Sequence, residues 1–249
     1  MDKQFALKYD ELEQTHWWFR ARSEILKKLL DSHLTWSRID NALEIGTSSG
    51  NNLYSLYPKN LNLWGVEPFE DNISIARNKG PVPVLKGTAE QLPAEIDNMT
   101  FDLITMFDVL EHTEDDMAVL TNIYHHLSDG GSLFISVPAY EWMWGEQDVI
   151  SHHYRRYTLS NLRQKTEKTG FNTVYSTYFN TFLFPPIAAI RLLANLKPQP
   201  EEPAEFGDFK YGNSFSNNLL YHIFKTEKWL LPHLKFPFGV SALIVVTKN

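Results

Sequence analysis

A short turn of glycine, serine and threonine follows the first strongly apolar run of the chain. It spans Glu44-Ile45-Gly46-Thr47-Ser48-Ser49-Gly50, and Glu67 ends the next apolar run. A glycine turn that leads into a helix presents backbone N–H groups to a polar ligand. A carboxylate at the end of the second strand can accept hydrogen bonds from both hydroxyls of a ribose. The pattern therefore indicates a nucleoside cofactor, with a simple tight turn as the alternative.

Two features of this turn discriminate between nucleoside cofactors. NAD sites favour the spacing Gly-x-Gly-x-x-Gly, which lets a pyrophosphate approach the backbone, and the chain lacks that spacing. Glu44 stands just before the first glycine of the turn, where its charge would repel a diphosphate. A cofactor with a cationic end and no phosphate therefore suits the turn better than NAD does.

Histidine, arginine and tyrosine side chains follow the fourth and fifth apolar runs. The imidazole pKa lies near neutrality, which suits proton transfer, and ligands of open α/β sheets bind at the carboxyl ends of the strands. We expect catalytic roles for His112, His153 and Tyr157, and contacts to the acceptor from Trp18, Arg155 and Arg156. The alternatives are a helix-capping role for His112, an arginine that braces its own loop, and packing of Tyr157 and Trp18.

The side chains of His152, His153 and Asp148 are also candidate metal ligands. Adjacent residues of a strand point apart, and the sequence offers no third or fourth ligand at a suitable spacing. We therefore expect no metal.

Apolar runs and helical patterns alternate along the first two thirds of the chain, which is typical of a doubly wound parallel sheet. The predicted strands are 41–46, 61–67, 83–87, 101–107 and 132–137, and the predicted helices between them are 50–57, 70–79, 90–95 and 114–128, with a helix stop at Asp129-Gly130-Gly131. A helix over 158–169, with Thr158 as its N-cap and Gly170 as its stop, precedes two more strands at 172–179 and 240–247.

Helical segments also flank this core. Residues 9–31 carry apolar side chains at helical spacing and predict one or two helices. About sixty residues separate the last two strands, a length that is uncommon without a function. They hold an apolar stretch (179–196), an acidic proline-rich stretch (198–205) and a helical run (216–231), so we expect a lid. Arg191 and the double proline make 179–196 too broken to span a membrane, and an interfacial or lid helix is the expectation.

Six stretches, in order from about residue 41 to 138, resemble the motifs of class I S-adenosylmethionine-dependent methyltransferases. They are the turn Glu44–Gly50, the acid Glu67, the segment Gly87-Thr88-Ala89-Glu90-Gln91-Leu92-Pro93, the segments Phe101-Asp102-Leu103-Ile104 and Asp108-Val109-Leu110-Glu111-His112, and Leu127-Ser128-Asp129-Gly130-Gly131-Ser132-Leu133. Three others, His16–Arg22, Asp148–Thr158 and Phe236–Ser241, resemble a bacterial subfamily of small-molecule methyltransferases. Ser48 replaces the middle glycine of the first motif, and Thr88 replaces the aspartate that usually precedes the alanine in the Gly87–Pro93 segment; both could weaken cofactor binding.

The resemblance implies a Rossmann-like α/β fold with a seven-stranded sheet, mostly parallel, whose last strand is antiparallel. It implies one methyltransferase domain over 1–249, with an N-terminal helical cap (1–35), a core (36–180), a helical lid inserted between strands six and seven (181–236) and the last strand (237–249). The implied cofactor is S-adenosyl-L-methionine, and its product is S-adenosyl-L-homocysteine. The cofactor residues implied are Arg22, Glu44, Gly46, Thr47, Ser48, Gly50, Glu67, Pro68, Thr88, Ala89, Glu90, Phe107 and Asp108.

The composition sets limits on partners and location. The 249 residues hold 23 Lys+Arg against 30 Asp+Glu, a net charge of −7, which disfavours a nucleic-acid partner. The absence of cysteine excludes disulfides, thiolate catalysis and cysteine zinc sites. The first residues lack the apolar core of a signal peptide, so we expect a cytoplasmic protein without stable membrane insertion. The oligomeric state stays open.

The expected activity is methyl transfer to an oxygen, nitrogen or carbon atom of a small-molecule acceptor. Sugar, lipid-linked and natural-product-like acceptors all fit the aromatic composition. The alternatives are a protein that binds the cofactor without turnover, as the changes at Ser48 and Thr88 suggest, and, less well supported, an NAD-dependent oxidoreductase.

Overall fold

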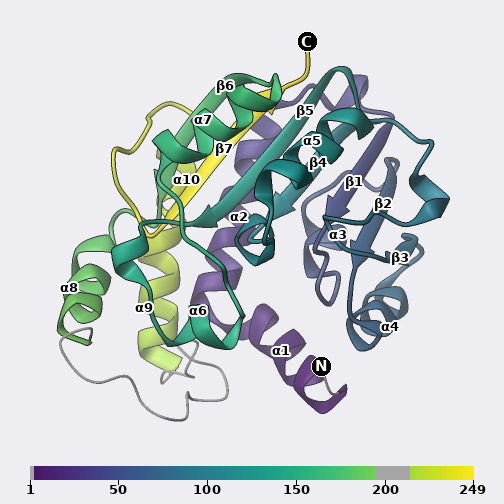
Figure 1. The fold of residues 1–249 in the computed structure, drawn as a ribbon. Coiled ribbons are helices and arrows are strands. Elements are labelled where there is room, and N and C mark those ends of the chain that lie inside the picture. Colours follow the sequence, from purple (N-terminus) through teal and green to yellow (C-terminus); the bar gives the residue numbers. More distant parts are fainter. Residues whose placement is uncertain (1–2, 195–213) are drawn as a thin grey trace.

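The computed structural model describes residues 3–194 and 214–249, and a seven-stranded sheet lies at their centre (Figure 1). The strands are β1 (Asn41–Ile45), β2 (Asn62–Glu67), β3 (Val84–Lys86), β4 (Phe101–Phe107), β5 (Leu127–Pro138), β6 (Asn172–Phe179) and β7 (Ser241–Thr247). Their order is β3-β2-β1-β4-β5-β7-β6. The first five are parallel neighbours, and β7 pairs antiparallel with both β5 and β6. The predicted Rossmann-like fold class is confirmed.

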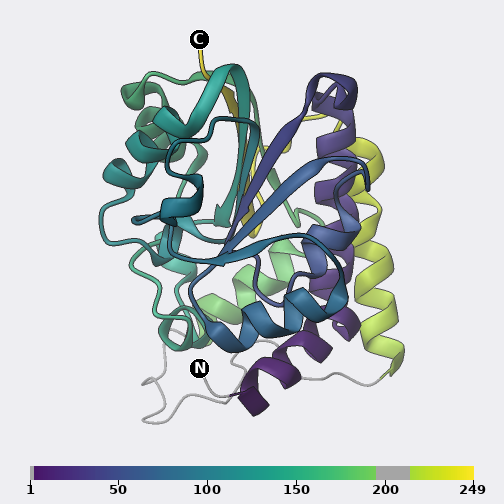
Figure 2. The ribbon, with the colours of Figure 1, turned by 90° about the vertical axis from the view of Figure 1, so that its right-hand side faces the viewer.

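Helices cover both faces of this sheet. α2 (Trp17–His33), α9 (Ser214–Lys225) and α10 (Glu227–Leu230) lie together on one face, with α3 (Asn51–Ser55) and α4 (Glu70–Lys79) beside them, whereas α5 (Asp116–His126) and α7 (Leu159–Thr169) cover the other (Figures 1 and 2). Successive side chains of a strand point to opposite faces, so Phe134 packs under α2 and its neighbour Ile135 packs under α5. This double burial explains why the strands are apolar runs without alternation.

A third group of elements lies at the end of the sheet where the parallel strands terminate. It consists of α1 (Lys3–Thr15), α6 (Glu146–Ile150) and α8 (Phe184–Ala194) (Figure 1). The same end carries two single turns of 3₁₀-helix, η3 (Leu110–His112) after β4 and η4 (Glu141–Met143) after β5. Two others, η1 (Trp36–Arg38) and η2 (Ala94–Ile96), precede β1 and β4.

The N-terminal helical pattern divides into two helices at His16. The His16 backbone is extended, with φ −74° and ψ 137°, and its Nδ1 accepts a hydrogen bond from the Trp18 N–H at 3.3 Å. A side chain that accepts a hydrogen bond at this position caps the new helix. The expected caps of α7 are confirmed: Thr158 Oγ1 accepts from the Asn161 N–H at 3.2 Å, and Gly170 has a φ of +111°.

Two predicted element boundaries are wrong. Residues 90–95 do not form a helix of their own, because the chain makes only the 3₁₀ turn η2 beyond Pro93. The helix predicted to reach residue 128 ends at His126, and β5 already begins at Leu127. Gly130, with a φ of +77°, lies inside this strand rather than at a helix stop, and its N–H donates to the Lys248 carbonyl.

The segment between β6 and β7 contains α8, α9 and α10 within its described part. The proline pair lies in the first turn of α8, where a missing N–H costs no helical hydrogen bond. The acidic stretch 198–205 lies outside the described residues. Over the described ranges, no helix is both long and apolar enough to cross a membrane.

Candidate active site

The turn after β1 is packed tightly against two other parts of the chain. Gly46 has a φ of +76°, and a Cβ placed on it would lie 2.4 Å from Cγ2 of Val109, which follows β4. Gly50 has a φ of +84°, and its Cβ would lie 2.8 Å from Cβ of Ala76 in α4. Both positions therefore need glycine for backbone conformation and for space. Ser48 also has a positive φ, of 50°, where a glycine would be less strained.

Glu67 ends β2 beside this turn, as expected, and its carboxylate is held by the chain itself. Oε2 accepts from the Ser48 N–H at 2.9 Å, and Oε1 accepts from the Asn72 amide at 2.9 Å and from the Phe69 N–H at 3.3 Å. The residue is buried, and burial raises its pKa despite these hydrogen bonds. To bind Glu67, the hydroxyls of a ribose would have to displace some of these donors from the carboxylate.

Glu44 and Thr47 place unpartnered polar atoms under the turn. Both residues are buried. Neither carboxylate oxygen of Glu44, nor the Thr47 hydroxyl, has a hydrogen-bond partner of ordinary geometry among residues 3–194 and 214–249. Burial raises the pKa of Glu44 to about 8, while the Tyr57 hydroxyl and the Arg22 charge oppose this rise.

Helix α1 covers the turn after β1 and the end of β2, which together form the first corner of the site, in keeping with the expected N-terminal helical cap. Asp10 Oδ1 accepts hydrogen bonds from Ser49 Oγ at 2.7 Å and Asn51 Nδ2 at 3.0 Å, and it pairs with Lys79 of α4. Glu13 Oε2 accepts from the same two side chains at 2.6 and 2.8 Å. The polar groups at the start of α3 are therefore satisfied by the N-terminal helix.

Tyr9 of α1 lies among the charged groups of the corner. Burial is the largest cause of its raised pKa, and the carboxylates of Glu13, Asp108 and Glu67 raise it further while Arg22 opposes them. Its ring makes an edge contact with Phe19 at 5.7 Å between centroids. The hydroxyl of Tyr9 thus belongs to the environment of the predicted cofactor residues.

Arg22 forms an ion pair with Asp108 at the end of β4. Its Nη2 lies 2.6 Å from Asp108 Oδ2, and both side chains are largely buried. The guanidinium also lies 5.1 Å from the centre of the Trp18 ring and 5.9 Å from that of Phe107. Its Nε is buried and has no hydrogen-bond partner within the described part of the chain. The structure therefore brings three other predicted site residues together around this guanidinium.

The remaining predicted cofactor residues follow β2 and β3. Pro68 comes directly after Glu67, and Ala89 is buried, whereas Thr88 and Glu90 are exposed. Thr88 Oγ1 accepts from the Gln91 N–H at 3.1 Å, so its hydroxyl closes a local turn.

A second corner, formed by η3 and the loop after β5, unites the two catalytic histidine candidates. The rings of His112 and His153 are 4.5 Å apart between centroids and nearly perpendicular. His153 Nδ1 lies 2.8 Å from Oδ1 of the fully buried Asp148. Desolvation and the neighbouring His153 lower the pKa of His112 to about 4, so its ring is neutral at pH 7. Hydrogen bonds from His153 and Arg156 outweigh burial and lower the pKa of Asp148 to about 2.

The other three candidates in this loop are engaged within the protein. Arg156 donates from Nε and Nη2 to the two oxygens of Asp148, each at 2.8 Å. Arg155 Nη1 lies 3.0 Å from Asp116 Oδ2. Tyr157 is 1% exposed, and its hydroxyl donates to Asp116 Oδ2 at 2.9 Å. The arginines therefore brace the loop, and the placement of Tyr157 in the core gives it a packing role.

Several residues of these corners are not among the predicted site residues. They are Tyr9, Asp10, Glu13, Lys79 and Glu111. The one available signal was the adjacency of Glu111 and His112 behind β4. The α1 contacts join residues far apart in sequence, which a local pattern does not reveal.

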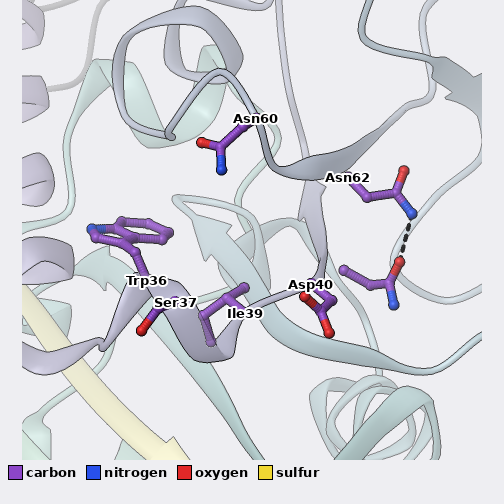
Figure 3. Close-up of a pocket in the computed structure, with 7 residues that line it drawn as sticks. Trp36, Ser37, Ile39, Asp40, Asn60 and Asn62 are labelled. Carbon is purple, nitrogen blue, oxygen red and sulfur yellow. Dashed lines mark hydrogen bonds between the residues drawn. The ribbon is translucent and has the colours of Figure 1, made fainter.

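A hollow at the opposite end of the sheet lies away from both corners. Trp36, Asp40, Asn41 and Asn62 are among the residues that line it, at the amino ends of β1 and β2 (Figure 3). Asn62 Nδ2 donates to Asn41 Oδ1 at 2.5 Å across its side. Ligands of open α/β sheets bind at the carboxyl ends of the strands, so this hollow is not the candidate active site.

The sheet order and the two corners at its carboxyl end define a class, the Rossmann-like methyltransferases. A family model described as a methyltransferase domain matches residues 11–176, and the chain belongs to that family. The class I methyltransferases of this kind use S-adenosylmethionine, which confirms the cofactor that the sequence motifs implied. A search of curated proteins found no match.

Solved structures share this fold over nearly the whole chain. An S-adenosylmethionine-dependent methyltransferase of Thermotoga maritima, described as a possible histamine N-methyltransferase, is 23% identical, with a TM-score of 0.59, and the match covers 99% of this chain and 97% of the other. A methyltransferase of Clostridium acetobutylicum is 14% identical, with a TM-score of 0.55 and coverage of 92% and 91%. Phosphoethanolamine N-methyltransferase 2 of Haemonchus contortus, solved with S-adenosyl-L-methionine, is 16% identical, with a TM-score of 0.54 and coverage of 84% and 49%.

Proposed function

We propose that this protein transfers the methyl group of S-adenosylmethionine to a small-molecule acceptor, and that a hydroxyl oxygen is the acceptor atom. The observation that carries the proposal is the pair of corners at one end of the sheet. One holds Glu67 and the glycine turn, and the other holds His112 and His153 beside the buried Asp148. The first suits a nucleoside, and the second suits activation of an oxygen.

The proposed cofactor roles are supported by the positions of the side chains around the glycine turn. Glu67 accepts from the ribose hydroxyls, and the backbone of Gly46–Gly50 contacts the methionine part. Arg22, whose Nε is a buried donor without a partner among the described residues, binds the carboxylate of that part. Pro68, Thr88, Ala89 and Glu90 line the adenine, while Phe107 and Asp108 lie nearest the sulfonium. Glu44 acts on the amino end of the cofactor from beneath the turn.

The reaction is an in-line displacement. The acceptor oxygen attacks the methyl carbon, a carbon–oxygen bond forms, the carbon–sulfur bond breaks, and both electrons of that bond stay on sulfur as the sulfonium becomes a thioether. The acceptor loses its proton at the second corner. Because the leaving group is good, the protein has to align the two substrates, exclude water from the sulfonium and let this proton leave the acceptor. Trp18, which stacks with Arg22, closes the acceptor side of the sulfonium.

Calorimetric titration tests the cofactor part of the proposal. We expect S-adenosylmethionine and S-adenosylhomocysteine to bind and NAD not to bind. Glu67→Ala should weaken binding by about 2 kcal/mol, or roughly thirtyfold, because a charged hydrogen-bond acceptor is lost. Glu70→Ala is the matched control, since Glu70 is an exposed carboxylate three residues further on. Equal affinity of Glu67→Ala and wild type would contradict the ribose assignment.

Product analysis tests the activity. Incubation with labelled S-adenosylmethionine and a panel of alcohols, phenols and amines should release S-adenosylhomocysteine with hydroxyl acceptors. Cofactor binding without turnover on the whole panel would favour the alternative, a cofactor-binding protein that has lost catalysis.

A further inference from the structure

Three potential metal ligands meet behind β4. One donor atom from each of Glu111, His112 and His153 lies within 4.8 Å of the other two. Glu111 and His112 are neighbours on η3, and His153 comes from the loop after β5. The Tyr154 N–H donates to the Glu111 carbonyl at 2.8 Å, which fixes the loop against η3. Two segments that are far apart in sequence are therefore held in contact at this point.

Glu111 provides an independent sign of a missing ligand. It is 0% exposed, and neither carboxylate oxygen has a hydrogen-bond partner among the described residues. A buried carboxylate without a partner is costly, so it needs a cation, a proton or a donor. A divalent cation at this point would give both oxygens a partner.

The surroundings of the two histidines match those of metal-bound imidazoles. Metal-bound histidines usually donate their second ring nitrogen to a carboxylate or a backbone carbonyl. His153 has Asp148 on Nδ1 at 2.8 Å, which leaves Nε2 for a ligand. His112 has a hydrogen bond to the backbone of Ser151. Arg156 and the Gly145 N–H donate hydrogen bonds to Asp148, so Asp148 is itself held in place and fixes the orientation of the His153 ring.

We propose that Glu111, His112 and His153 bind one divalent transition-metal ion, with zinc as the best fit. Two imidazoles and one carboxylate are a known ligand set for catalytic zinc, which keeps a fourth position open. Bonds of about 2.1 Å place tetrahedral ligands about 3.4 Å apart, so the widest pair has to approach by about 1.4 Å at most. This approach requires a rotation of the side chain of His112, which is the exposed member of the three.

The open position is where the acceptor hydroxyl binds, and this part rests on the proposed function. A metal-bound hydroxyl loses its proton to solvent more readily than a free one. The resulting alkoxide forms the bond to the methyl carbon while the carbon–sulfur bond breaks. Asp108, which is paired with Arg22, precedes Glu111 in the segment that follows β4, so the metal corner adjoins the cofactor corner.

Metal binding is measured directly on the full chain without a histidine tag. The protein is treated with a chelator and dialysed, and it is then titrated with Zn²⁺, Mn²⁺ and Mg²⁺ by calorimetry, with metal content determined by mass spectrometry. We expect one zinc ion per chain and affinity in the order zinc, manganese, magnesium. Glu111→Gln, His112→Gln and His153→Gln should each weaken zinc binding at least a hundredfold. His125→Gln, which changes an exposed histidine of α5, should not.

Each outcome decides the proposal. Absence of stoichiometric zinc binding by wild type, or equal binding by the three variants, would overturn it. His112→Gln guards against loss of folding, because His112 is exposed and its change leaves the core intact. Titration of the chelated wild type with S-adenosylhomocysteine separates the two proposals. Cofactor binding without zinc binding overturns only the metal site, and zinc binding without cofactor binding overturns only the proposed function.

Discussion

Two buried carboxylates at the carboxyl end of the sheet, those of Glu67 after β2 and Glu111 after β4, are held in opposite ways. Glu67 has hydrogen-bond partners supplied by the chain. Glu111 has none among the described residues, as is also true of Glu44 beneath the glycine turn. Glu67 therefore has to exchange partners when a ligand arrives, whereas Glu111 already presents free oxygens.

The two arrangements differ in their free-energy cost. Replacing protein hydrogen bonds with cofactor hydrogen bonds costs little net energy but requires movement. A buried carboxylate without a partner lowers the stability of the folded state, and this cost is offset only when a ligand binds. Glu67 is thus suited to exchanging its hydrogen-bond partners, and Glu111 is suited to binding a ligand without losing any partner. Three substitutions test this contrast, beyond the experiments on Glu67 and the metal ligands.

Gly46→Ala should have the largest effect, because it disturbs the contact that joins the two corners. The new Cβ would lie 2.4 Å from Val109 Cγ2, at a φ of +76°. Overpacking and backbone strain together should cost about 4 kcal/mol and lower the melting temperature by about 10 °C. Gly130→Ala is the control, because its φ is +77° with no atom within 4 Å of the new Cβ. Equal shifts in thermal unfolding would show that the contact with Val109 does not matter.

Glu44→Gln should change how stability depends on pH. Burial raises the pKa of Glu44 from 4.5 to about 8 in the folded chain. The folded state therefore keeps a proton that the unfolded state releases, and stability falls as the pH rises from about 4.5 to 8. We expect a loss of about 3 kcal/mol in wild type across this range, and a flatter profile in Glu44→Gln. Denaturant unfolding at several pH values measures both. Parallel profiles would mean that another group carries the dependence.

Asp10→Asn should have the smallest effect, on the rate of cofactor binding. Asp10 ties α1 to Ser49, Asn51 and Lys79. Loss of its charge should weaken this attachment by about 1 kcal/mol and speed cofactor association about fivefold. Stopped-flow tryptophan fluorescence gives the rate. Glu11→Gln is the control, because Glu11 is an exposed carboxylate on the same helix. An unchanged rate in Asp10→Asn would mean that α1 does not need to move.

The sequence predicted the sheet well because each strand is a continuous apolar run that the helices cover on both faces. β1 and β4, for example, lie where their runs predict. The end of α5 was misplaced, because Gly130 resembles a helix stop but has its positive φ within a strand. The rule that glycine ends helices describes a backbone conformation, and the same conformation also occurs in an irregular strand.

The candidate site was predictable where its residues follow a strand directly. Glu67, the glycine turn and Asp108 are of this kind, since strand ends fix their positions. The attachment of α1 and the meeting of Glu111 with His153 were not predictable. They depend on the folding of the N-terminal helix and of the loop after β5 onto the sheet, which no local periodicity encodes. Spacing along the chain gave no third ligand for His153, and only the three-dimensional structure supplied two.

The antiparallel pairing of β6 with β7 has an evolutionary and practical consequence. Phe179 at the end of β6 lies opposite Ser241 at the start of β7. The chain therefore leaves the sheet after Phe179 and returns to it at the neighbouring position, Ser241. An insertion between these residues can change in length and sequence without altering any strand register, and its entropic cost grows only slowly with length. A change of length in this segment that leaves α9 and α10 in place on α2 therefore leaves the sheet intact.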